Sequence, residues 1–225
     1  MAKLCVALDT DYEKAINLVE ELKGYPLIFK VGYKLFIPYG REVVETIKRI
    51  SPKAELFLDL KLHDIPNTVR NGVRGATHLG VDYLTLHTLG GKEMIETAAG
   101  VKGNTKLLGV TLLTSHDEGY LREIGVSLPK EEFILRLAKI GLESGCDGLV
   151  CSAHEVAFLK ERLGDFLAVV PGIRPEGADK GDQKRVATPR EAVERGADIL
   201  VVGRPIVEAP DPKAVVERIL EEISL

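Results

Sequence analysis

Hydrophobic residues gather in eight short runs that are spaced at fairly even intervals along the chain. Each run has the length of a strand and is apolar almost throughout, as expected when both faces of a parallel strand are covered. The runs predict strands over residues 4–8, 27–31, 55–58, 83–86, 107–112, 148–150, 167–170 and 199–202.

The segments between these runs carry apolar residues at helical spacing. They predict helices over residues 12–22, 43–50, 69–79, 92–99, 130–143, 156–163, 189–195 and 212–223. Strand and helix therefore alternate eight times, which is typical of α/β proteins with a parallel sheet.

Eight strand-helix units in 225 residues predict a closed (β/α)8 or TIM barrel, with one catalytic domain over residues 1–225. The structural alternative is a doubly wound open sheet. That fold usually has fewer strands at this length, and no Gly-x-Gly-x-x-Gly turn follows the first predicted strand. The one long connection, residues 171–187, is rich in glycine and charge and is expected to be a mobile loop.

Composition narrows the classes of protein that remain. Hydrophobic residues make up 45% of the chain and charged residues 28%, as in an ordinary globular domain. The net charge of −4 and the scattered basic residues argue against a dedicated nucleic-acid or membrane surface. The three cysteines lack disulfide or zinc-site spacing, and no signal-peptide or membrane-spanning pattern occurs, so we expect a cytoplasmic protein.

Charged residues cluster at the end of the third predicted strand, where a barrel builds its active site. Asp59 and Lys61 are two apart in an extended segment, so both side chains should point to the barrel mouth. We favour a functional pair over a structural ion pair, because buried charges are costly to desolvate. Asp64 follows just before Pro66, and capping of the next helix is an equally good interpretation of Asp64 alone.

Other polar residues follow the remaining strands. Gly203 and Arg204 come after the last strand and open a helix, which predicts a phosphate site, although a glycine turn with an exposed arginine is the alternative. Arg174 and the charged residues 182–185 could add phosphate and base contacts, or form only a solvated loop. Further polar groups at strand ends, to which residue type alone assigns no role, are His87, Thr114, Cys151 and Ser152.

These segments together resemble the orotidine 5′-phosphate decarboxylase family over nearly the whole chain. The run from Asp59 to Thr68 matches the family signature D-x-K-x-x-D-I-P-N-T without a departure. Supporting segments occur in the family's order, at residues 6–9, 30–32, 113–115, 171–174, 182–185 and 203–206. The ordered set is far more specific than the D-x-K triplet alone.

The resemblance implies decarboxylation of orotidine 5′-monophosphate to uridine 5′-monophosphate, without cofactor or metal, in pyrimidine nucleotide biosynthesis. It implies that Lys61 stabilises a carbanion at C6 and donates the proton, while Asp59 repels the departing carboxylate. It also implies a homodimer in which Asp64 and Thr68 of one subunit complete the site of the other. It implies that Lys30 also braces the charged array, so that Lys61, Asp59, Asp64 and Lys30 form the catalytic set. The substrate-binding residues that it implies are Asp9 and Lys30 for the ribose, Thr114 for the pyrimidine, and Arg174, Gln183, Gly203 and Arg204 for the phosphate side.

Two other functions compete with this one. A metal-dependent sugar-phosphate decarboxylase or aldolase of the same barrel superfamily shares the D-x-K-x-x-D strand, but residues 65–68 favour the nucleotide decarboxylase. A catalytically silent nucleotide-binding barrel is the second rival, and the intact Asp59, Lys61 and Asp64 argue against it.

Overall fold

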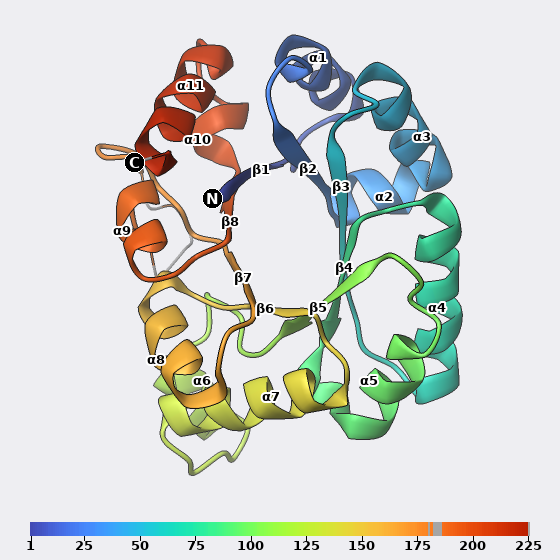
Figure 1. Cartoon of the computed structure of the whole chain (residues 1–225), viewed down its shortest axis with the longest axis vertical. Helices are drawn as coiled ribbons and strands as arrows, with labels where there is room; N and C mark the ends of the chain where they lie inside the picture. The colour runs from blue at the N-terminus through green and yellow to red at the C-terminus, as the bar shows by residue number, and fades with distance from the viewer. Residues whose placement is uncertain (180, 182–185, 225) are drawn as a thin grey trace.

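The chain folds into a closed barrel of eight parallel strands that pair in sequence order, β8 closing on β1. The computed structural model describes residues 1–179, 181 and 186–224. The strands form a ring with the helices outside it (Figure 1). Their bounds are β1 Lys3–Ala7, β2 Leu27–Val31, β3 Glu55–Leu62, β4 Tyr83–His87, β5 Lys106–Val110, β6 Gly148–Val150, β7 Leu167–Val170 and β8 Ile199–Val202. The predicted TIM barrel is confirmed, and the doubly wound alternative is wrong.

Each predicted helix is present on the outside of the barrel. The helices that cover the strands are α1 Tyr12–Leu22, α3 Arg41–Ile50, α4 Pro66–Leu79, α5 Gly91–Ala99, α7 Lys130–Ser144, α8 Ala153–Leu163, α9 Pro189–Glu194 and α11 Pro212–Ile223. The helix predicted to open at Gly203 and Arg204 is the short α10 Arg204–Val207. Three other short elements were not predicted: α2 Tyr33–Tyr39, the 3-10 turn η1 Thr88–Gly90 and α6 Glu118–Glu123. They are too short to show helical periodicity in the sequence, and α2 contains Pro38.

Alternating side chains of each strand separate two hydrophobic clusters. In β1, Leu4 and Val6 belong to the large cluster between strands and helices, whereas Cys5 and Ala7 belong to a smaller one. The smaller cluster fills the barrel interior with one or two residues from seven of the strands, among them Phe57 and Tyr83. This packing follows from the period of two along a strand. The polar residues predicted for the site lie beyond this apolar interior, at the carboxyl ends of the strands.

Aspartates brace the opposite, amino-terminal end of the barrel. Asp82, Asp147 and Asp198 each precede an even-numbered strand and accept a hydrogen bond from a backbone N–H of the preceding strand, at 2.7–2.8 Å. Lys102 pairs with Asp147 at 3.1 Å at this end. Ion pairs here therefore serve strand alignment, which makes them useful controls for the charged groups at the other end.

Two strands end more than one residue away from the predicted position. β5 ends at Val110 instead of residue 112, and β3 continues to Leu62 instead of ending at residue 58. The extension of β3 is irregular: Leu58 pairs with Leu84, but the next pair is Leu62 with Leu86. Three residues of β3 thus lie opposite one residue of β4. This bulge carries the charged residues of the site.

Candidate active site

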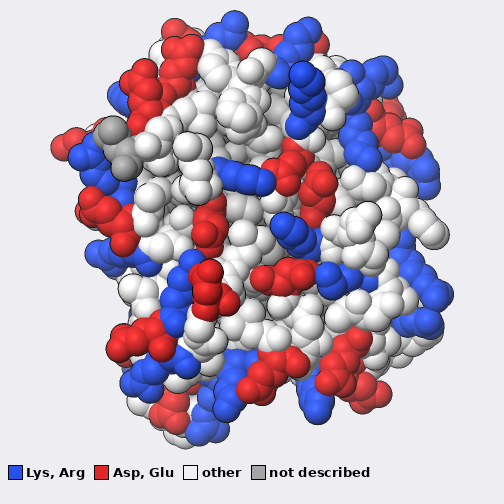
Figure 2. All heavy atoms as spheres, in the orientation of Figure 1, with Lys and Arg blue, Asp and Glu red and all other residues white. Residues whose placement is uncertain are grey.

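A cavity of about 810 Å³ opens at the carboxyl ends of the strands. Charged side chains of both signs also gather around the barrel axis on the opposite, amino-terminal face, which Figure 2 shows. Eight residues predicted for the site line this one cavity: Asp9, Lys30, Asp59, Lys61, Thr114, Arg174, Gly203 and Arg204. The sequence placed them in or after six different strands, and barrel closure brings them together.

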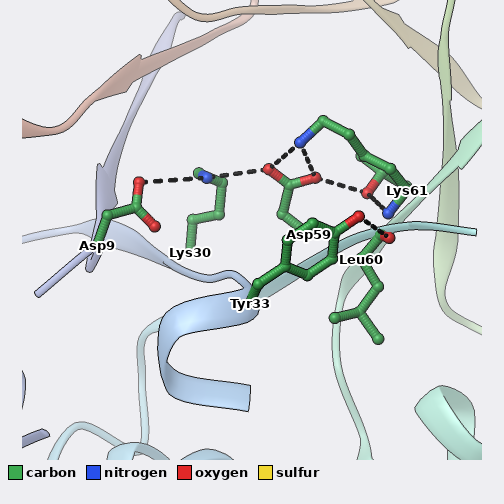
Figure 3. Close-up of polar contacts among 7 residues, drawn as sticks. Asp9, Lys30, Tyr33, Asp59, Leu60 and Lys61 are labelled. Atoms are coloured by element: carbon green, nitrogen blue, oxygen red, sulfur yellow. Dashed lines mark hydrogen bonds and ion pairs between the residues drawn. The ribbon is translucent and has the colours of Figure 1, made fainter. Parts of the chain in front are cut away.

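Four charged side chains lie in a row across the cavity wall (Figure 3). Nζ of Lys30 lies 2.9 Å from Oδ2 of Asp59 and 3.9 Å from the carboxylate of Asp9. Nζ of Lys61 lies 2.9 Å from both carboxylate oxygens of Asp59. The charges therefore alternate in the order Asp9, Lys30, Asp59, Lys61, with Asp59 shared between the two ammonium groups.

The backbone of Lys61 departs from the regular strand that the sequence predicted. Its φ of 48° is the single positive value among non-glycine residues in the described part of the chain. Strict alternation therefore does not explain why Lys61 and Asp59 meet, and that part of the prediction is wrong. The bulge in β3 turns Lys61 so that its ammonium reaches the Asp59 carboxylate.

Burial and ion pairing shift the pKa values of Asp59 and Lys30 in opposite directions. Burial raises the pKa of Asp59, but the ammonium groups of Lys30 and Lys61 outweigh it and hold the pKa well below its usual range. Burial lowers the pKa of Lys30, but Asp59 and Asp9 outweigh it and raise the net value. Both groups are therefore charged at neutral pH.

Thr85 is a site residue that the sequence did not reveal. It lies in β4 with 1% of its surface exposed. Its hydroxyl donates to Oδ1 of Asp59 at 2.7 Å and accepts the backbone N–H of Lys61 at 3.0 Å. A threonine within an apolar strand carries no signal of this role, because its partners lie more than twenty residues away in sequence.

The arginines predicted for phosphate follow β7 and β8, the strands that complete the ring beyond β1. Arg174 is buried and donates to the backbone carbonyls of Asp179 and Ile173, both at 3.0 Å. Arg204 is exposed, and its guanidinium lies so close to Gly181 that a Cβ there would collide with it. The long connection after β7 thus contacts the residues that follow β8. Gln183 lies outside the described residues.

Asp64 and Thr68 do not line the cavity of their own chain; both are exposed at the start of α4. The N-cap position of α4 is Ile65, which makes no side-chain capping bond, and the Asp64 carboxylate accepts the adjacent N–H of Ile65, at 2.7 Å. Capping of α4 by Asp64 is therefore not observed. Ile65, between Asp64 and Thr68 in sequence, is a large exposed apolar side chain; others at the carboxyl end of the barrel are Tyr33 and Ile37 in α2 and Leu89 in η1.

The other polar residues at strand ends divide into two groups. His87 lines the cavity, and its ring lies 5.6 Å from that of His63. Burial, His63 and Lys61 lower the pKa of His87, so the imidazole is neutral at pH 7. Cys151 and Ser152 are buried and do not line the cavity.

Within residues 1–179, 181 and 186–224, no three His, Cys, Asp or Glu side chains are grouped as a metal site. The helices of that same part of the chain include none with the length and apolar character needed to cross a membrane.

Known proteins with similar sequences and structures agree on one family. The family model described as "Orotidine 5'-phosphate decarboxylase / HUMPS family" matches residues 2–219. The orotidine 5′-phosphate decarboxylase of Aquifex aeolicus (strain VF5) is 49% identical over 227 residues and 98% of each chain. That of Shewanella sediminis (strain HAW-EB3) is 45% identical over 99% of this chain and 97% of the relative. The crystal structure of the Lactobacillus acidophilus orotidine 5′-phosphate decarboxylase matches over the full length of both chains, with 42% identity and a TM-score of 0.87. The chain therefore belongs to the orotidine 5′-phosphate decarboxylase / HUMPS family.

Proposed function

We propose that this protein is a carboxy-lyase that converts orotidine 5′-monophosphate to uridine 5′-monophosphate and carbon dioxide in pyrimidine biosynthesis. The observation that carries the proposal is the row of alternating charges from Asp9 to Lys61 along one wall of the cavity. Desolvating such a row costs free energy whatever its role, and charges kept in a cavity despite that cost are typical of a functional site. The names of relatives at 41–49% identity supply the substrate.

Loss of carbon dioxide from C6 of the pyrimidine leaves a carbanion that no adjacent carbonyl can delocalise. Catalysis must then come mainly from charges that are already in place. In our proposal the Lys61 ammonium stabilises the negative charge at C6 and then donates its proton there. Asp59 repels the substrate carboxylate and, through its two contacts at 2.9 Å, holds Lys61 in position.

The remaining cavity residues bind the parts of the nucleotide that do not react. Asp9 and Lys30 take the ribose hydroxyls, and Thr114 takes the pyrimidine. Gly203, Arg204 and Arg174, together with Gln183, take the phosphate side. Binding energy from the phosphate then closes the loop after β7 over the site, which excludes water and orders the charges. The contact of Arg204 with Gly181 supports this link, because it joins the phosphate side to that loop.

The active form in our proposal is a homodimer. Asp64 and Thr68 reach into the cavity of the second subunit, which explains why charged and hydroxyl residues of the family signature lie outside their own cavity. The exposed side chains of Tyr33, Ile37, Ile65 and Leu89, from elements that follow β2, β3 and β4, are the apolar groups that the second copy would cover.

One assay separates this function from its two rivals. Purified protein is incubated with orotidine 5′-monophosphate in excess chelator, while substrate absorbance and carbon dioxide are followed together. We expect matching loss of absorbance and release of carbon dioxide. A requirement for added divalent metal would favour the sugar-phosphate enzyme. Binding of uridine 5′-monophosphate with no turnover would favour the silent barrel.

A further inference from the structure

Thr85 occupies the place in the β3–β4 ladder where regular strand pairing fails. Leu58 pairs with Leu84 and Leu62 with Leu86, so residues 59–61 lie opposite Thr85 alone. The N–H of Lys61 donates to the hydroxyl of Thr85 instead of to a strand carbonyl. A side chain of β4 thus closes the bulge that β3 opens.

The direction of both hydrogen bonds at Thr85 follows from the groups involved. A backbone N–H can only donate, so the Lys61 N–H at 3.0 Å uses a lone pair of the hydroxyl. The ionised Asp59 carboxylate can only accept, so the hydroxyl proton points to Oδ1 at 2.7 Å. One hydroxyl therefore ties the backbone of Lys61 to the carboxylate that binds its ammonium.

This tie acts on a backbone that needs support. Lys61 has a φ of 48°. Residues with a Cβ atom adopt a positive φ rarely, and mostly where the surrounding structure imposes it. Oδ1 of Asp59 also accepts Nζ of Lys61, at 2.9 Å. Thr85, Asp59 and Lys61 thus form a closed loop of contacts in which the hydroxyl is the sole uncharged side-chain group.

We infer that Thr85 is a positioning residue that fixes the Lys61 backbone and the Asp59 carboxylate in the geometry needed for turnover. The expected effect on kcat rests on the proposed function. The expected effect on the positions of Lys61 and Asp59 does not. A buried threonine that only fills space would be replaced by valine at little cost, since the two side chains have the same shape. The hydroxyl is the group under test.

The experiment compares three variants with the wild type. Thr85→Val removes the hydroxyl, and Thr85→Ser keeps it while losing the methyl group. Thr88→Val is the matched control, because Thr88 is also fully buried and its hydroxyl donates to a backbone carbonyl, that of Val110, at 3.1 Å. For each protein, kcat and KM for orotidine 5′-monophosphate, the Tm and a crystal structure are obtained.

We expect Thr85→Val to lower kcat at least tenfold, about 1.4 kcal/mol, with KM changed less than threefold. Thr85→Ser should keep kcat within threefold of wild type, and so should Thr88→Val. In the crystal structure of Thr85→Val, Lys61 should leave its positive φ or its contact with Asp59. A wild-type kcat for Thr85→Val, or an equal loss in Thr88→Val, would overturn the inference. If the wild type fails to release carbon dioxide, the proposed function is wrong, and an unchanged Lys61 geometry in Thr85→Val then decides against the positioning role.

Discussion

Replacement of Lys61 by alanine is the substitution that separates chemistry from binding most cleanly. It removes the ammonium that contacts both oxygens of Asp59 at 2.9 Å. The Asp59 carboxylate is not left unpaired, because Lys30 still lies 2.9 Å away and the Thr85 hydroxyl at 2.7 Å. The fold and the phosphate side of the cavity should therefore survive the change.

The size of the kinetic effect follows from the charge that Lys61 offers to C6. Opposite unit charges about 4 Å apart interact by roughly 4 kcal/mol at an effective dielectric near 20. Since each ~1.4 kcal/mol is tenfold in rate, losing this term alone should lower kcat by about a thousandfold. Loss of the proton donor adds to the effect. Affinity for uridine 5′-monophosphate should change by less than about tenfold, because the ammonium acts mainly on the transition state.

Lys102→Ala is the matched control for this variant. Lys102 is 25% exposed and Lys61 28%, and each binds one aspartate, but Lys102 lies at the amino-terminal end of the barrel. We expect Lys102→Ala to lower the Tm without lowering kcat. Steady-state kinetics, calorimetric binding of uridine 5′-monophosphate and thermal unfolding are measured for both variants. Near wild-type turnover by Lys61→Ala would refute the role of its ammonium.

Three further predictions concern the phosphate side, the buried carboxylate and the second subunit. Arg204→Ala should raise KM, and free phosphite should activate wild-type turnover of a substrate lacking its phosphate but not turnover by the variant; unchanged kinetics with the full substrate would remove Arg204 from the phosphate site. The folded-state pKa of Asp59 is lowered, so its contribution to stability is complete above its unfolded pKa of about 4 and is lost as the pH falls through the folded value. Denaturant unfolding at pH 7 and pH 3 should accordingly show a larger loss for wild type than for Asp59→Asn, and equal losses would contradict the assignment. Mixing Lys61→Ala with Asp64→Asn should restore up to about a quarter of wild-type activity through hybrid dimers with one intact site, whereas no recovery after subunit exchange would argue against sharing of Asp64.

The barrel could be predicted because its strands are apolar on both faces. Runs such as residues 199–202 are buried throughout and have no polar face to obscure their boundaries. The end of β3 could not be predicted in the same way, because alternating Asp59, Leu60 and Lys61 look like a regular strand. The bulge arises from pairing with β4, and that long-range contact leaves no local pattern.

The site residues could be predicted where a charged residue lies near the end of a predicted strand. Asp9, Lys30, Asp59 and Lys61 lie at or near the ends of strands, and barrel closure, together with the bulge in β3, brings them into one row. Thr85 was missed because a hydroxyl in a strand has no distinctive spacing, and its importance depends on the positive φ of Lys61. Asp64 looked like a helix cap because its proposed partner belongs to another chain.

The central claim is that Lys61 stabilises a carbanion at C6, and it can be tested without decarboxylation. By microscopic reversibility, an enzyme that stabilises this carbanion should also form it from the product. Uridine 5′-monophosphate is therefore incubated with wild type and with Lys61→Ala in heavy water containing excess chelator, and the C6 hydrogen is followed by NMR. The account predicts exchange of that hydrogen for deuterium by wild type and its loss in Lys61→Ala. No exchange by wild type, or equal exchange by the variant, would contradict it.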